Sequence, residues 1–265
     1  MDGSDPHALK ALLDWQAELG ADEPIGDVPV DCYALPDKLG RPETPALEVK
    51  PGAARGVSRP EKPDAGRFID AARIAAEGAE DLAALKVAVA AFEGCELKRG
   101  AKTTVFADGN PAARVMVIGE APGRDEDAAG LPFVGTAGRL LDKMFAAIGK
   151  ARTDETAENS LYITNVLPWR PPQNRTPTPE EIAMLKPFLE RHVALANPDV
   201  LVIMGNVACS AILGKTGVTR LRGNWAEAMG RPTLPMFHPA YLLRTPAAKR
   251  EAWADLLSLQ ARVRG

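Results

Sequence analysis

Four short apolar segments, separated by stretches of helical periodicity, occupy the second half of this 265-residue chain. The apolar segments are RVMVIG at 114–119, LYITNV at 161–166, DVLVIMG at 199–205 and TLPMFH at 233–238. The helical patterns lie at 136–149, 179–196, 207–213 and 247–263. Short apolar strands that alternate with helices are typical of a parallel sheet covered on both faces. We therefore predict an α/β fold, a three-layer α/β/α arrangement around a central four-stranded parallel sheet.

The first third of the chain has a different character. Leucines at near-helical spacing within 7–20 predict an amphipathic helix. Residues 21–64 are rich in Pro, Gly, Asp and Glu and show little periodicity, which is typical of a segment that cannot bury enough apolar surface to fold alone. Helical periodicity returns at 68–94, with a break near Gly78. The predicted organisation is an N-terminal helix in 1–20, a Pro/Gly-rich linker in 21–67 and one domain in 68–265 that opens with helices.

Composition limits the kind of protein. No apolar run approaches the roughly 18–20 residues of a membrane span, and the N-terminus lacks a basic-then-apolar signal pattern. The three cysteines are far apart, which argues against a disulfide framework and against a zinc site. The net charge is −3, yet 170–250 hold 11 Lys and Arg against 5 Asp and Glu, compatible with a phosphate-binding face or with ordinary solvated surface. We expect a soluble cytoplasmic protein without a metal.

Polar residues follow the predicted strands, where parallel sheets bind their ligands. In chain order these residues are Glu120, Asn165, Asn206 and His238, and Phe133 lies in the loop after the first strand. The chain has no GxGxxG, Walker lysine loop or GxSxG elbow. An amide can hydrogen-bond to the edge of a heterocycle, and an aromatic ring can stack on its face. A histidine can stabilise charge on a leaving oxygen, and a carboxylate can hold a water molecule. The set suits hydrolysis of a base–sugar bond.

Each of these residues also fits a plainer role. His238 fits a structural histidine, Phe133 a core aromatic and Asn165 the cap of a turn. Glu120 is harder to explain in that way, because a carboxylate directly after a buried strand is unfavourable unless it is paired or used. The residues alone predict a base-binding pocket and leave the reaction open.

Three longer motifs resemble one family. The segments GEAPGRDED…GLPFVGTAG, YITNVLPWRPPQNRTPTPEE and HPAYLLRTP are similar, in order and spacing, to the motifs of family 4 uracil-DNA glycosylases. The resemblance runs from about Ala91 to the C-terminus. It implies that 68–265 form a uracil-DNA glycosylase-like domain and that the protein is a monomeric DNA-repair enzyme. Its partner would be uracil-containing DNA, single- or double-stranded, from which it excises uracil or other deaminated bases and leaves an abasic site.

The resemblance also implies residue roles. The enzyme would flip a deoxyuridine out of the helix, stack Phe133 on the uracil and bond its amide edge with Asn165. Glu120 would position the attacking water, and His238 would donate to the oxygen that gathers charge as uracil leaves. Glu126 would shape the pocket near the fifth carbon of the base. Which of the two carboxylates, Glu120 or Glu126, dominates catalysis stays open.

Further positions complete the implied site. Ala121 stands where other glycosylases of the superfamily carry an aspartate, and Gly123 lies in the same pocket loop, where a larger side chain would exclude a methyl group on the base. Both are assigned to substrate binding. The residues assigned to DNA contact are Arg170, Leu242, Leu243 and Arg244, and the last three would push into the base stack.

Two other functions stay open. The first is a protein that binds damage or abasic sites with weak turnover, although such a binder needs no carboxylate to position water. The second is a nucleotide-binding regulatory domain, which leaves the HPAYLLR segment unexplained. Retention of Glu120, Asn165 and His238 together favours the active glycosylase.

Family 4 enzymes hold an iron–sulfur cluster on four cysteines, and this chain departs from that pattern. Of the four positions, only Cys95 keeps a cysteine; the others hold Phe92, Trp169 and Leu185. Clusters need thiolate ligands, which these three side chains cannot supply. We therefore expect no cofactor and no metal. We predict instead that the three large apolar side chains pack together and join the helix ending near Cys95 to the helix at 179–196.

Overall fold

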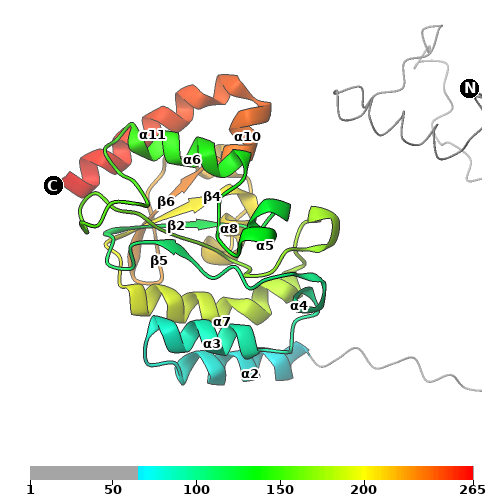
Figure 1. The fold of residues 1–265 in the computed structure, drawn as a ribbon. Helices are drawn as coiled ribbons and strands as arrows, with labels where there is room; N and C mark the ends of the chain where they lie inside the picture. Colours follow the sequence, from blue (N-terminus) through cyan, green and yellow to red (C-terminus); the bar gives the residue numbers. More distant parts are fainter. Residues whose placement is uncertain (1–64, 265) are drawn as a thin grey trace, which may run out of the picture. The chain divides into compact units, whose positions relative to one another are not determined.

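A mixed six-stranded sheet forms the centre of the structure, a computed structural model that describes residues 65–264 (Figure 1). The strand order is β1-β3-β2-β4-β6-β5. The strands are β1 (Asp108–Gly109), β2 (Val115–Gly119), β3 (Tyr162–Asn165), β4 (Val200–Met204), β5 (Ala226–Ala228) and β6 (Arg231–Met236). The helix predicted in 1–20 and nearly all of the predicted linker lie outside the described residues.

The four inner strands, β3, β2, β4 and β6, are parallel, as the sequence predicts. The outer strands β1 and β5 run antiparallel to their neighbours and extend the predicted sheet. With two and three residues, both are too short to show the period-two alternation that predicts a strand. The predicted parallel core is therefore confirmed, and the sheet has one additional short strand at each edge.

Ten α-helices and two short 3₁₀ helices are present in the described part of the chain. The α-helices are α2 (Ala65–Glu77), α3 (Leu82–Ala91), α4 (Leu97–Gly100), α5 (Arg124–Ala129), α6 (Thr136–Ala146), α7 (Pro179–Ala196), α8 (Gly205–Leu213), α9 (Val218–Leu221), α10 (Pro239–Arg244) and α11 (Lys249–Arg264). The 3₁₀ helices are η1 (Pro172–Asn174) and η2 (Pro246–Ala248). The predicted helices correspond to α6, α7, α8 and α11, whereas α4, α5, α9 and α10 have four to six residues and show too few turns for a helical pattern.

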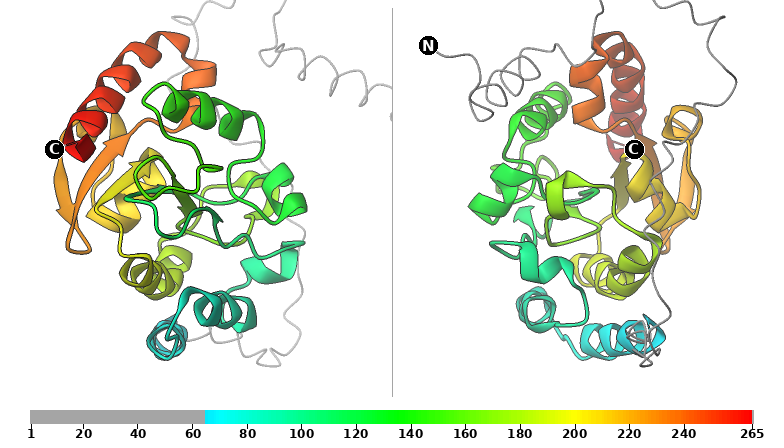
Figure 2. Two further views of the ribbon diagram at one scale, coloured as in Figure 1. Left: turned by 60° about the vertical axis from the view of Figure 1, so that its left-hand side comes forward. Right: turned by 90° about the vertical axis from the view of Figure 1, so that its right-hand side faces the viewer.

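Alternate residues of the inner strands face two separate hydrophobic cores. On β2, Val115 and Val117 belong to a core that includes buried side chains of α6 and α11. Met116 and Ile118 of the same strand belong to the other core, with side chains of α7 and α8. In both views of Figure 2, α6 and α11 lie on one side of the sheet and α7 lies on the other with α2 and α3. The predicted three-layer arrangement is confirmed.

Local sequence signals set several helix ends. A capping box begins α7: the Thr178 hydroxyl accepts the Glu181 N–H, and the Glu181 carboxylate accepts the Thr178 N–H. The predicted helix at 68–94 consists of α2 and α3, which are separated after Gly78. Asp81 then caps α3 by accepting the N–H of Ala84. Helix α2 begins in the last three residues of the predicted linker segment.

The four positions that hold cysteines in family 4 enzymes lie in one hydrophobic core. Phe92, Cys95, Trp169 and Leu185 are all buried and belong to the same cluster, on the face of the sheet covered by α7. The Phe92 ring packs edge-on against Phe188 of α7, with ring centroids 5.3 Å apart. Burial raises the pKa of the Cys95 thiol, which favours the uncharged form. This apolar site with one protonated thiol does not fit an iron–sulfur cluster.

Replacement of Trp169 tests how much this packing stabilises the domain. Trp169 is 1% exposed, and its indole N–H donates to the Thr104 hydroxyl at 3.0 Å. We expect Trp169→Ala to lower the free energy of unfolding by about 3–5 kcal/mol, because it removes a fully buried aromatic ring. Denaturant unfolding measures the change. Trp253→Ala is the matched control, since Trp253 is 44% exposed and should change stability by less than about 1 kcal/mol. Equal effects of the two substitutions would contradict the assignment.

Candidate active site

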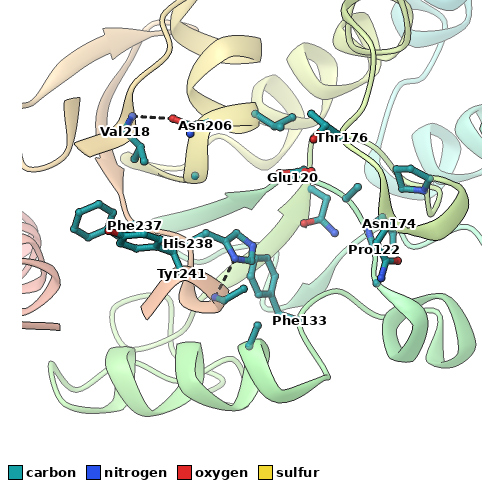
Figure 3. Close-up of a pocket in the computed structure, with 18 of the residues that line it drawn as sticks. Glu120, Pro122, Phe133, Asn174, Thr176, Asn206, Val218, Phe237, His238 and Tyr241 are labelled. Carbon is teal, nitrogen blue, oxygen red and sulfur yellow. Dashed lines mark hydrogen bonds between the residues drawn. The ribbon is translucent and has the colours of Figure 1, made fainter. Parts of the chain in front are cut away.

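A cavity of about 780 Å³ lies beyond the carboxyl ends of the inner strands (Figure 3). Glu120 follows β2 directly, Asn165 ends β3, Asn206 follows β4 in the first turn of α8, and His238 comes two residues after β6. The strand ends therefore converge, as the sequence predicts. Of the predicted site residues, those that line the cavity are Glu120, Ala121, Gly123, Glu126, Phe133, Asn165, His238 and Arg244.

Glu120 presents an unpaired carboxylate to this cavity. It is half-buried, and burial raises the pKa of its carboxyl group. Its backbone oxygen accepts the N–H of Leu167, which fixes the chain at the end of β2. Within residues 65–264 no donor bonds to the side chain. The carboxylate is therefore available to hold a water molecule or to stabilise a developing positive charge.

Asn165 is buried at the end of β3, opposite Gly119 of β2. A Cβ at Gly119 would overlap both the Asn165 side-chain oxygen and the Phe133 ring, so only glycine permits this arrangement. Among the described residues none bonds to the Asn165 amide. Its donor and its acceptor are both free to bind a ligand with the complementary polar edge.

Phe133 supplies an aromatic wall beside the histidine. Its ring is buried and lies 5.4 Å from the His238 ring, with 28° between the planes. The residue has a φ of 55°, a left-handed conformation that non-glycine residues seldom adopt. An uncommon backbone conformation of this kind persists only where the surrounding contacts hold it.

His238 is held as a neutral hydrogen-bond donor. Its Nδ1 accepts the backbone N–H of Ala240 at 3.2 Å, at the start of α10, so the ring proton lies on Nε2. The pKa of His238 is lowered to about 4, chiefly by burial and also by the positive charge of the nearby Arg244, while Glu126 opposes the change. Near neutral pH the imidazole is therefore uncharged, with a single N–H for a ligand.

Glu126 differs from Glu120 in that its carboxylate already accepts hydrogen bonds from the backbone. One oxygen accepts the N–H groups of Val134 and Gly135, at 3.1 and 2.9 Å, and the other accepts the N–H of Gly123 at 3.1 Å. These bonds join the loop after β2 to the loop that carries Phe133. The geometry gives Glu126 a role in holding the two pocket loops together.

The predicted DNA-contact residues separate into buried and exposed ones. Leu242 is 0% exposed and belongs to the hydrophobic core, so it cannot enter a base stack while the domain stays folded. This corrects its assignment to DNA contact. Leu243, the next residue of α10, is 41% exposed, and Arg244 lines the cavity. Arg170 lies beside the cavity, where its Nε donates to the Asn174 side chain at 2.8 Å.

The cavity wall also contains residues outside the predicted site. Asn174, the last residue of η1, and Arg175 and Thr176 in the loop that follows line it, and this short irregular segment gave no periodic signal. Asn206 accepts the N–H groups of Gly217 and Val218, which fixes the segment at the start of α9. Its position just after β4 was a usable signal, because β4 lies in the sheet between β2 and β6, the strands followed by Glu120 and His238.

Residues 65–264 contain neither a cluster of metal-binding side chains nor a helix suited to crossing a membrane. Within 65–264, no three or more His, Cys, Asp or Glu side chains gather in a way that could hold a metal ion. In the same part of the chain, no helix has the length and apolar character that crossing a membrane requires.

Comparisons with known proteins agree on one family. Residues 106–257 match the model of the uracil DNA glycosylase superfamily. The chain is 42% identical over 153 residues to a type-4 uracil-DNA glycosylase of Thermotoga maritima, covering 57% of this chain and 77% of that protein. It is 39% identical over 170 residues to a type-4 enzyme of Archaeoglobus fulgidus, with 61% and 82% covered. A type-5 uracil-DNA glycosylase of Pyrobaculum aerophilum is 30% identical over 162 residues, with 56% and 71% covered.

The protonation state of His238 can be measured directly. Nitrogen-15 NMR of labelled histidine should show His238 neutral at pH 6, with the proton on Nε2, because burial lowers its pKa to about 4. The signal is assigned by its loss in the His238→Gln spectrum. A ring that titrates near the ordinary value of about 6.5, or that carries its neutral-form proton on Nδ1, would contradict the structure.

Proposed function

The chain belongs to the uracil DNA glycosylase superfamily, and from this membership we propose that it excises uracil from DNA by hydrolysing the bond between base and deoxyribose. The observation that carries the proposal is one cavity that holds a free carboxylate, a free amide, an aromatic ring and a neutral histidine donor. The substrate is uracil in single- or double-stranded DNA, flipped into this cavity, and an abasic site remains.

Base recognition rests on Phe133 and Asn165. The buried Phe133 ring offers a face on which a flat base stacks, and the Asn165 amide offers one donor and one acceptor. Uracil presents the complementary pair, whereas cytosine presents donor and acceptor exchanged. A wrong edge would leave buried polar groups unpaired, which discriminates strongly between bases. Ala121 and Gly123 complete the pocket wall.

Bond cleavage depends on His238 and Glu120. As the C1′–N1 bond breaks, its electron pair stays with the uracil and negative charge gathers on a carbonyl oxygen of the base. The Nε2–H of neutral His238 stabilises that charge as an oriented donor. Water adds to C1′ and loses a proton to the free Glu120 carboxylate, which also stabilises the cationic sugar. We assign Glu126 to positioning, because three backbone donors occupy its carboxylate.

Contact with DNA falls to the rim of the cavity. Leu243 and Arg244 lie exposed near the end of α10, and Arg244 lines the cavity. We infer that these side chains fill the gap that a flipped base leaves in the stack. Insertion of an apolar side chain into such a gap stabilises a distorted duplex. Arg170 and Arg244 add positive charge for the phosphates. Leu242 of α10 packs in the hydrophobic core and so attaches the helix to the domain.

An assay with a uracil-containing oligonucleotide, followed by alkaline cleavage, tests the proposed activity. We expect strand scission by the wild-type protein without added cofactor, through several turnovers under excess substrate. His238→Ala should lower the single-turnover rate on the order of a hundredfold or more, the loss of about 2.7–4 kcal/mol that follows removal of one such donor. DNA affinity should change little. A single burst without turnover would instead indicate a damage-binding protein, and absence of scission on both strand forms would reject the activity.

The pH dependence of the reaction identifies the working carboxylate. Burial raises the pKa of Glu120 above the ordinary value of about 4.3. As the pH falls, Glu120 therefore takes up a proton earlier than an ordinary glutamate does. His238 stays neutral over that range, because its pKa is lowered to about 4. We expect the single-turnover rate to fall up to tenfold per pH unit below the pKa of Glu120. Glu120→Gln should have a low single-turnover rate that does not fall further in this acidic pH range. The exposed control Asp125→Asn should keep both the wild-type rate and its fall at low pH. A wild-type limb in Glu120→Gln would contradict the role.

A further inference from the structure

Phe133 has a backbone conformation that phenylalanine seldom adopts. Its φ of 55° places a bulky aromatic residue in the left-handed region, where glycine and asparagine are usual. The neighbouring Gly138 of α6 accommodates this conformation, because a Cβ there would overlap the Phe133 carbonyl group. Phe133 carries the ring of the base pocket, so whatever holds its backbone also sets the ring plane.

Arg152 binds the two peptide groups that flank Phe133, while Glu126 binds the N–H groups of the next two residues. Its guanidinium donates to the carbonyl oxygens of Pro132 and Phe133, at 2.9 and 3.0 Å, and thus binds two consecutive peptide groups. The same group contacts Asp108 of β1 at 2.8 Å and Asp142 of α6 at 2.9 Å. The Arg152 side chain is 12% exposed. It therefore joins the edge of the sheet, helix α6 and the Phe133 segment.

The geometry of this contact suits arginine alone among the basic side chains. A planar guanidinium has five N–H groups in a fixed fork, which here bind two carbonyls and two carboxylates. A lysine ammonium is a compact charge on a flexible stem and cannot keep two neighbouring carbonyls at fixed angles. Arg152 does not line the cavity, so any effect on the reaction must pass through the segment it holds.

We propose that Arg152 is a positioning residue for base recognition, which holds Phe133 in its left-handed conformation so that the ring stacks on the flipped uracil. The proposal rests on the uracil-excision activity proposed above. Arg152 contributes no group to the chemistry. Its carboxylate partners Asp108 and Asp142 orient the guanidinium and neutralise its charge away from the base pocket.

A double-mutant cycle on the single-turnover rate tests the proposal. We expect Arg152→Gln to lower the rate at least tenfold in the wild-type background and by less than twofold in the Phe133→Ala background, because the ring it positions is then absent. Arg152→Lys, which keeps the charge and loses the fork, should follow the same pattern with a smaller loss. Arg152→Lys replaces Arg152→Gln in the cycle if the glutamine variant does not fold. The unfolding midpoint is measured for every variant.

Arg114→Gln is the matched control. Arg114 also binds a carboxylate and a backbone carbonyl, those of Asp199 and Val263, but it lies before β2 at the opposite end of the strands. Its replacement should leave the rate within twofold. Equal losses for Arg152 variants in both Phe133 backgrounds, or no loss in the wild-type background, would overturn the proposal. An inactive wild-type protein would instead reject the proposed function, so the two failures are distinguishable.

Discussion

Burial of both faces of four parallel strands is the constraint on which the rest of the structure depends. On β2, Val117 faces one hydrophobic core while Met116 and Ile118 face the other. A polar side chain within such a strand is unfavourable unless it is paired, as Thr164 of β3 is with the carbonyl oxygen of Phe106. Polar groups that are open to a ligand therefore lie where the strands end. Because the strands are parallel, those ends share one edge, and Glu120 and Asn165 meet there.

The same removal from water has opposite consequences for the two ionisable groups of the site. Desolvation disfavours the charged form of each, so it lowers the pKa of His238 and raises the pKa of Glu120. For the histidine the neutral form is the useful one, since it keeps a single N–H directed by the bond from Ala240. The proposed hydrolysis needs the glutamate in its charged form, and within residues 65–264 no donor bonds to its side chain. The same buried environment thus keeps His238 as a neutral hydrogen-bond donor and raises the proton affinity of Glu120, the proposed base.

Hydrophobic packing takes the place that the family resemblance gives to an inorganic cluster. Phe92, Trp169 and Leu185 lie in the core between the sheet and the helices on the α7 face. A cluster would tie these segments together through iron–thiolate bonds; here burial of three large side chains does so through contact and exclusion of water. None of these three side chains lines the cavity that contains the proposed catalytic residues. We therefore expect them to contribute to stability and to supply no group to the chemistry.

The sequence by itself determined the parallel strands, the main helices and the strand-end residues, because these follow from local periodicity and from a topological rule. It did not separate Leu242 from Leu243: the six residues of α10 are too few for a helical pattern, so which leucine faces the core depended on packing. It left open which of Glu120 and Glu126 dominates catalysis, and the bonds from three backbone groups to the Glu126 carboxylate are what distinguish the two in the structure. Nor does any local signal at Arg152 point to Phe133, 19 residues earlier. Tertiary structure decided these points because each depends on atoms brought together from separate segments.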